Sequence, residues 1–298
     1  MKPVAVIFFA ASAVLMFHGA PARAREVVDA TQTQVNLNDR PARIITLAPS
    51  LGELAAGLSG GDLTRIVGVS EYTDYPAALI QVASIGSYAR FNLEKVVALK
   101  PDLVLATLDG NSRDQVLHLR ELGLPVVVVA TANLKDVEAS MRLVGLAMGV
   151  PAAADLMAKN FAAALNRIRV ESKRRASHRS VLLQLGDDPL VAAGGGAFLT
   201  DALEAVGASN LYGDAGTHYP RPSLEDVVHR DPDVIVVLAL GHDLKPFEAM
   251  TSRWSRFAGL KAVKAGRVRL LQADSLLRPT PRLIDGLSLL EKAIYEAR

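Results

Sequence analysis

Cysteine is absent from the 298 residues of this sequence, and aromatic residues make up only 5% of it. A chain without cysteine has no disulfide, no thiolate nucleophile and no cysteine-ligated metal site. An excess of one charge is absent too, because 33 basic residues face 31 acidic ones. The triplet Lys173-Arg174-Arg175 follows a helical pattern and is typical of a solvated helix end, so the composition gives no support to nucleic-acid binding.

The N-terminus has the pattern of an export signal. Lys2 supplies a positive charge, residues 4–17 form an apolar run, and an A-x-A cleavage pattern stands at 22–24. The run of about 14 residues is shorter than the roughly 20 that span a bilayer, which favours a cleaved signal over an uncleaved anchor. We predict that residues 1–24 are a signal peptide and that the protein is exported to the periplasm. Cleavage removes two basic residues and no acidic one, so the mature chain is near neutral.

The first half of the chain alternates short apolar segments with helical ones. Segments typical of buried strands are found at 43–47, 66–69, 103–106 and 125–130, and helical patterns at about 51–58, 115–122 and 134–148. Strand–helix units of about 30 residues indicate a largely parallel sheet covered by helices. The sequence therefore predicts an N-terminal α/β lobe over residues 41–150.

A long amphipathic pattern begins at Pro151 and runs to about Arg175. Its apolar residues recur at helical spacing, and little Gly or Pro interrupts it. A helix of this length would measure roughly 35–40 Å, the diameter of a small domain. We predict a bridging helix over residues 151–178.

A second α/β lobe is predicted over residues 179–298. Its strands are expected at 180–185, 234–240 and 267–271, and its helices at 199–206 and 281–297. The glycines at 194–196 are interpreted as a flexible turn, and the single tryptophan, Trp254, as a core residue. The expected fold is therefore α/β, with two Rossmann-like α/β lobes of mainly parallel sheets joined by one long rigid helix.

Two distant stretches of the chain are nearly the same. Residues 92–105 align without a gap on residues 223–236, and each copy reads as a helix cap, a short helix, a Pro-Asp turn and a buried strand. Glu94 and Glu225 occupy the same place in the first helical turn, where the helix dipole favours a carboxylate. They either stabilise their own helices or, as one exposed carboxylate per lobe, meet a two-fold partner that bears two basic sites.

Three segments carry a resemblance to a known family: 68–76, 92–106 and Gly110-Asn111. They resemble the periplasmic binding proteins of ABC importers for vitamin B12, haem and iron siderophores. The resemblance covers about 43–298 and is most specific over 68–125. It implies a protein that is not an enzyme and has no cofactor of its own, with two lobes bridged by a rigid helix and a ligand in the cleft between them. It also implies that a monomer delivers the ligand to a permease dimer in the inner membrane, and that Glu94 and Glu225 are the transporter-docking residues.

Ligand-binding residues are expected just after the strands, because ligands of α/β lobes lie at the carboxyl ends of strands. Aromatic faces suit a flat macrocycle, and Asp, Asn and Arg can meet its amide rim. The position in the chain and the resemblance together point to Tyr72, Tyr88, Thr107, Asn111, Tyr219, Asp274 and Arg278, with Tyr75, Phe91 and Asp109 in the same segments. Tyr88, Thr107 and Tyr219 stand where the corrinoid carriers of the family have tryptophan, which reduces the stacking area. The expected ligand is cobalamin or a related corrinoid, and the alternative is haem or a ferric siderophore.

Other kinds of site have weaker support. Haem would need an axial ligand such as Tyr72, Tyr88 or His218. No metal site is expected, since the histidines lack ligand spacing. A periplasmic α/β hydrolase would depend on Ser50 at a strand-to-helix turn, but the sequence has no G-x-S-x-G elbow, no H-E-x-x-H and no Walker loop.

Overall fold

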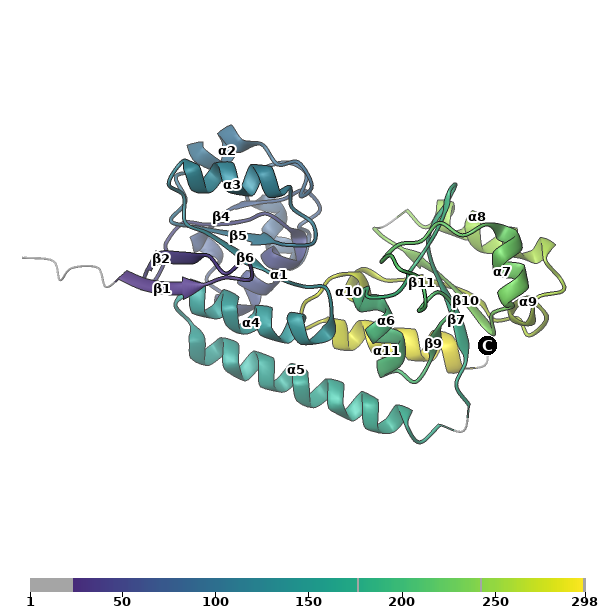
Figure 1. The fold of residues 1–298 in the computed structure, drawn as a ribbon. Helices are drawn as coiled ribbons and strands as arrows, with labels where there is room; N and C mark the ends of the chain where they lie inside the picture. The colour runs from purple at the N-terminus through teal and green to yellow at the C-terminus, as the bar shows by residue number, and fades with distance from the viewer. Residues whose placement is uncertain (1–23, 176, 242, 297–298) are drawn as a thin grey trace, which may run out of the picture.

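The protein forms two α/β lobes that lie side by side above one long helix (Figure 1). The computed structural model describes residues 24–296 except 176 and 242. The predicted signal peptide, apart from Ala24, lies outside the described residues. In the part of the chain that is described, no helix is both long and apolar enough to cross a membrane.

The N-terminal lobe is built on a four-stranded parallel sheet of order β4–β3–β5–β6. Its strands are β3 (Ile44–Thr46), β4 (Ile66–Val69), β5 (Leu103–Thr107) and β6 (Val126–Val129). Helices α1 (Pro49–Leu58) and α4 (Leu134–Met148) pack on one face, and α2 (Leu93–Ala98) and α3 (Arg113–Glu121) on the other. Because both faces are covered, the strands are apolar along their whole length, as the sequence predicted.

The C-terminal lobe has a mixed sheet of order β11–β10–β7–β8, with β9 also paired to β7. The strands are β7 (Ser180–Asp187), β8 (Leu190–Ala192), β9 (Ser209–Asn210), β10 (Val234–Ala239) and β11 (Val268–Gln272). Only β8 pairs antiparallel, in a hairpin with β7. The two parallel-sheet lobes confirm the predicted fold class.

Helices cover both faces of this second sheet. Helices α6 (Phe198–Ala205), α10 (Asp274–Leu277) and α11 (Leu283–Tyr295) share the core of one face. Helices α7 (Leu224–Arg230), α8 (Lys245–Arg253) and α9 (Lys261–Lys264) cover the other. Short 3₁₀ turns are η1 (Leu63–Arg65), η2 (Ala77–Gln81) and η3 (Trp254–Arg256). Trp254 is buried and donates its indole N–H to Gln184 Oε1 at 2.8 Å, which confirms its prediction as a core residue.

Helix α5 (Pro151–Ser172) runs beneath both lobes and is about 33 Å long (Figure 1). It ends at Ser172, three residues before the end of the amphipathic pattern near Arg175 and six residues before the predicted limit of 178. Its buried apolar residues, Ala154, Ala158, Phe161 and Leu165, belong to one continuous core that includes residues of both sheets. It also packs closely on α4, because a Cβ at Gly145 would lie 2.0 Å from Ala154 Cβ. A shared core and a close helix pair make α5 a rigid connection.

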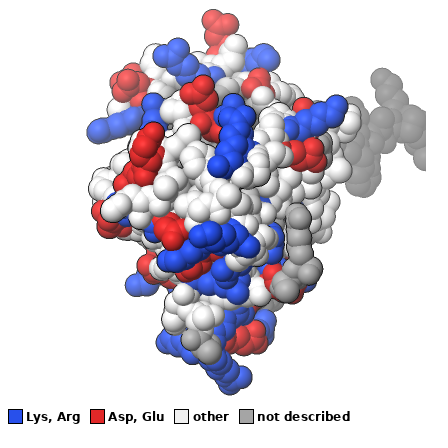
Figure 2. Space-filling view, turned by 90° about the vertical axis from the view of Figure 1, so that its right-hand side faces the viewer, with Lys and Arg blue, Asp and Glu red and all other residues white. Residues whose placement is uncertain are grey.

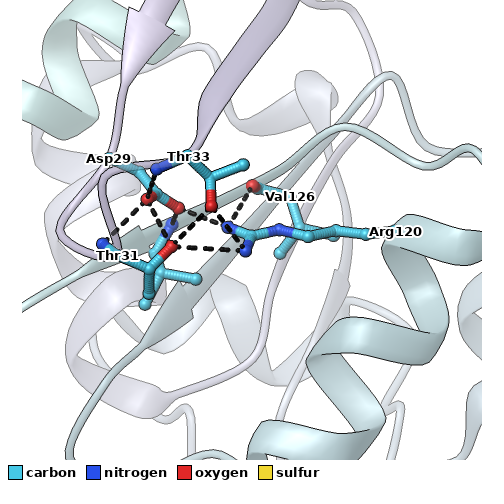
Figure 3. A network of polar contacts seen from close by, with 6 residues as sticks. Asp29, Thr31, Thr33, Arg120 and Val126 are labelled. Carbon is cyan, nitrogen blue, oxygen red and sulfur yellow. Dashed lines mark hydrogen bonds and ion pairs between the residues drawn. The ribbon is translucent and has the colours of Figure 1, made fainter.

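An N-terminal hairpin was not predicted. Strands β1 (Ala24–Val28) and β2 (Gln34–Asn38) pair antiparallel, and Val35 and Leu37 point into the core in strict alternation. The turn is fixed by the buried carboxylate of Asp29, which accepts hydrogen bonds from its own turn and pairs with Arg120 of α3 (Figure 3). The sequence shows this region only as a polar stretch, because its short strands carry few apolar residues.

The turn at Gly194–Gly196 is closely packed, not the flexible turn that the sequence suggested. A Cβ at Gly194 would lie 2.3 Å from the carbonyl oxygen of Thr217, and one at Gly195 would lie 2.4 Å from that of Ala215. Glycine is needed here because two backbone segments approach each other.

Candidate ligand-binding cleft

A cavity of about 590 Å³ lies between the lobes. It is lined by the residues that follow the carboxyl ends of strands of both sheets, where ligands of α/β lobes are expected. The lining includes Ser50, Tyr72, Asp74, Tyr88, Thr107, Asp109, Thr131, Phe198, His218, Tyr219, Asp274, Leu277 and Arg278. The volume falls in the range of small-molecule sites.

The N-terminal wall presents two tyrosine rings. Tyr72 follows β4 with a left-handed backbone (φ 63°) and is 78% exposed, an unfavourable combination for a large non-glycine residue. Tyr88 is half-exposed, and its ring lies against Gly110, where a Cβ would come within 3.0 Å of it. Both rings are available to a ligand because little of the protein covers them.

Asn111 supports this wall from behind. Its Oδ1 accepts the backbone N–H of Thr107 at 2.7 Å, and its Nδ2 donates to the carbonyls of Leu47 at 2.8 Å and Tyr88 at 2.6 Å. Its polar atoms therefore tie the loop after β5 to the segment that carries Tyr88, and the residue is not among those that line the cavity.

The C-terminal wall is formed by Phe198, His218 and Tyr219. The rings of His218 and Tyr219 meet edge to face, with centroids 6.5 Å apart. The ring of His218 lies close to Gly196: a Cβ on that glycine would be 3.1 Å from His218 Nε2. Tyr219 is half-exposed, so one phenol from each lobe (Tyr88 and Tyr219) faces the cavity.

Arg278 links the lobes at the edge of the cavity. Its Nη1 lies 2.6 Å from Asp74 Oδ1, and its Nη2 donates to the carbonyl of Tyr72 at 3.1 Å. Arg278 Nη1 also lies 3.9 Å from Glu53 Oε2. The left-handed turn at Tyr72 is thus fixed by a side chain of the opposite lobe.

Buried Glu53 of α1 makes a second connection between the lobes. Its carboxylate accepts hydrogen bonds from Thr280 Oγ1 at 2.6 Å and from Arg282 Nη1 at 3.1 Å, and both donors precede α11. The guanidinium of Arg282 also lies 3.7 Å from the ring centroid of Tyr75. These contacts oppose separation of the lobes.

The cavity lining contains more acid than base. Asp74, Asp109 and Asp274 face a single guanidinium, that of Arg278, which is already paired with Asp74. Burial raises the pKa of Tyr219, and the nearby Tyr88 and Asp109 raise it further, so this phenol keeps its proton at neutral pH. Such a site favours a neutral or cationic ligand with hydrogen-bond donors over an anionic one.

The structure brings together six of the seven predicted ligand-binding residues: Tyr72, Tyr88, Thr107, Tyr219, Asp274 and Arg278 line the cavity, and Asn111 lies behind its wall. Of the neighbouring candidates, Asp109 lines the cavity, whereas Phe91 is buried in the N-terminal core. Sequence reasoning did not select Asp74, Phe198 or Leu277. Phe198 has one usable signal, its place at the start of a helix directly after the glycine turn.

The two predicted docking glutamates lie away from the cavity. Glu94 and Glu225 are exposed in the first turns of α2 and α7, whose N-caps Asn92 and Ser223 each accept a backbone N–H. Hydrogen bonds from its own N–H and from Ser223 lower the pKa of Glu225, so this carboxylate is ionised at neutral pH. Basic and acidic side chains are interspersed over the face of the molecule seen in Figure 2.

Comparison with known proteins identifies the family to which the chain belongs. The sequence profile described as periplasmic binding protein matches residues 44–275, and the chain belongs to this family. Its members bind solutes and are not enzymes, so the hydrolase alternative is set aside. The chain is an α/β solute-binding protein of this family.

Individual relatives are similar over most of their length. A vitamin B12-binding protein of Vibrio cholerae is 31% identical over 250 residues, which are 82% of this chain and 86% of the relative. The crystal structure of a periplasmic vitamin B12-binding protein of Vibrio cholerae has a TM-score of 0.75 at 28% identity and covers 85% of this chain and 96% of its own. A periplasmic haem-binding protein of Pseudomonas aeruginosa has a TM-score of 0.74, also at 28% identity, with 87% and 94% covered.

Proposed function

We propose that this protein is exported to the periplasm, captures cobalamin or a related corrinoid between its lobes and delivers it to an ABC importer. The observation that carries the choice of ligand is the charge of the cleft. Aromatic faces from both lobes surround a cavity whose lining holds three carboxylates and one paired arginine. A corrinoid offers a flat ring with amide N–H donors at its rim, which suits this combination of aromatic faces and acceptors. The similarity to vitamin B12-binding proteins supports the same choice.

Haem and ferric siderophores are the second candidate. The similarity to haem-binding proteins and the presence of Tyr72, Tyr88 and His218 in the cavity lining favour haem. The charge of the cleft opposes it. Haem carries two propionate groups, whereas the arginine in the described cavity lining, Arg278, is already paired with Asp74.

The ligand is tested by titrating the purified protein with cyanocobalamin, dicyanocobinamide and haemin, followed by calorimetry and absorbance. We expect at least one corrinoid to bind at micromolar concentration or below. Tyr88→Ala and Tyr219→Ala should each weaken that binding about tenfold, because each removes a stacking face. Leu156→Ala, at an exposed position of α5 outside the cavity, should leave it unchanged. If neither corrinoid binds and haemin gives a Soret band that is lost in Tyr72→Ala, haem replaces the corrinoid.

Delivery is proposed to use Glu94 and Glu225. One exposed carboxylate per lobe can pair with basic groups on the two halves of a permease dimer and so set the register of docking. A Glu94→Ala/Glu225→Ala variant should lose ligand uptake in cells while its ligand affinity stays the same. Glu248→Ala is the matched control, since Glu248 is also an exposed glutamate in the first turn of a helix. Normal uptake by the double variant would remove the docking role.

Export is proposed to remove residues 1–24. The mature protein recovered from the periplasm should then begin at Arg25 and migrate as a monomer on size exclusion. Mass spectrometry and light scattering of that fraction measure both properties.

A further inference from the structure

The internal repeat contains identical residues that the fold itself explains. Val96 and Val227, at equivalent positions of α2 and α7, are both fully buried and anchor their helices to the sheets. Asp102 accepts the backbone N–H groups of Ala42 at 2.8 Å and Arg43 at 2.7 Å. Its equivalent, Asp233, accepts the N–H of Ser180 at 2.9 Å, so each aspartate fixes the start of the central strand of its own lobe.

Val97 and Val228 are also identical in the two copies, but they point outward. Their exposed fractions are 42% and 43%. The next outward position has diverged, with Ala98 in one copy and His229 in the other. Exposed positions that share no constraint are expected to carry different residues in the two copies, as Ala98 and His229 do. Full burial, which accounts for Val96 and Val227, therefore does not account for Val97 and Val228.

An exposed valine brings no benefit to a short helix by itself. A β-branched side chain loses rotamer freedom in a helix, so its helix propensity is low. Leu224 lies one turn before Val228 on α7 and is exposed to a similar degree, so the two form an apolar strip on the helix surface. On α2, Leu93 stands at the equivalent position before Val97 and is partly exposed.

Each valine also lies three residues after a docking glutamate. Positions three apart are neighbours on a helix, so Glu94 adjoins Val97 and Glu225 adjoins Val228. Helices α2 and α7 lie on different lobes, and both are away from α5 (Figure 1). The molecule thus presents the same pair of groups twice, a carboxylate beside an exposed apolar side chain.

We propose that Val97 and Val228 form the apolar centres of two equivalent docking patches for the permease dimer, a deeper form of the delivery role proposed above. The partner is a membrane protein with two-fold symmetry. At each of its two docking sites it offers a basic group next to an apolar surface. The glutamate sets register through charge, and the valine contributes affinity through burial. The same chemistry in both lobes matches a partner made of two identical halves.

The test uses the full-length mature protein and its importer reconstituted in nanodiscs. Val97→Thr/Val228→Thr keeps the shape of both side chains and replaces one methyl group in each by a hydroxyl. We expect this double variant to bind the importer about tenfold more weakly, because a hydroxyl left without a partner in an apolar contact opposes association. Val170→Thr on α5 is the matched control, since Val170 is 44% exposed on a helix, and its binding should equal that of the wild type.

The outcomes separate docking from ligand capture. Cyanocobalamin affinity should be the same in the wild type and the double variant, because neither valine lines the cavity. Equal importer affinity of the double variant and the wild type would overturn the docking patches. A wild type that binds cyanocobalamin but not the importer would overturn the delivery role, and a wild type that binds no corrinoid would overturn the proposed ligand alone.

Discussion

The buried carboxylate of Asp29 provides the sharpest test of how the N-terminal hairpin is held. Its Oδ1 accepts the backbone N–H groups of Thr31 at 2.8 Å and Thr33 at 3.1 Å, and the hydroxyl of Thr31 at 2.6 Å. Its Oδ2 accepts the N–H of Val128 at 2.9 Å and pairs with Arg120 (Figure 3). Every neighbour is a donor, so the site needs two acceptor oxygens.

The substitution Asp29→Asn removes one of these acceptors and keeps the shape. Whichever oxygen is replaced, an NH₂ group then faces other donors, and the guanidinium of Arg120, whose side chain is 18% exposed, loses its counter-charge. Breaking a buried ion pair from one side costs about 3–5 kcal/mol of unfolding free energy. In a chain of this size the loss corresponds to a fall in Tm of roughly 5–9 °C.

The loss should depend on pH in a defined direction. Burial would raise the pKa of Asp29, but the hydrogen bonds from Thr31, Val128 and Thr33 outweigh it and leave the pKa below the ordinary 3.8. A carboxyl group with a lowered folded-state pKa adds stability above its unfolded pKa and loses it as pH falls through the folded value. The difference between wild type and Asp29→Asn should therefore be full near pH 7 and shrink below about pH 4.

Chemical denaturation of both proteins at several pH values measures this difference. Asp39→Asn is the control, because Asp39 is an exposed aspartate close to the same hairpin, and it should change the unfolding free energy by less than about 0.5 kcal/mol. A loss below about 1 kcal/mol for Asp29→Asn at neutral pH would refute the reasoning, as would a difference that grows in acid.

Three further substitutions test the frame of the cleft. Gly145→Val should lower the unfolding free energy by about 1–3 kcal/mol in denaturant melts, because its Cβ would overlap Ala154 of α5. Trp254→Phe should cost about 1–3 kcal/mol, because it leaves buried Gln184 without its indole donor; an unchanged melt would contradict this. Asn111→Ala should weaken corrinoid binding, because Asn111 holds the segment that carries Tyr88 although it does not itself line the cavity. Unchanged affinity in calorimetry would show that this support of the wall does not contribute to binding.

The sequence predicted the elements that bury continuous apolar runs. Strand β4 and helix α4 match their predicted limits of 66–69 and 134–148, because their patterns end at strong turn and cap signals. The β1–β2 hairpin, α8 and α9 were not predicted. Their apolar residues are few, and contacts with distant parts of the chain stabilise them.

The candidate site was also predicted only in part. Position after a strand pointed to Tyr72, Thr107 and Asp274, because parallel strands bring their carboxyl ends to one edge. Tyr88 and Tyr219 were selected by their place beside the two repeat copies and by the resemblance to the family. The role of Asn111 behind the wall could not be predicted from the sequence, since it depends on carbonyl oxygens of distant segments that accept hydrogen bonds from its Nδ2. The excess of carboxylates over guanidinium groups in the cavity could not be predicted from the sequence either, because both lobes contribute residues to the lining.

The sequence alone determined the class of fold, the bridging helix and the repeated cap–helix–strand unit, since periodicity and capping are local properties of the chain. Only the tertiary structure decided which residues share a surface. It joined Arg278 to Asp74 across the cleft, and it separated the buried Val96 from the exposed Val97 beside it. Neighbours in the chain and neighbours in space are different sets, and binding depends on the second.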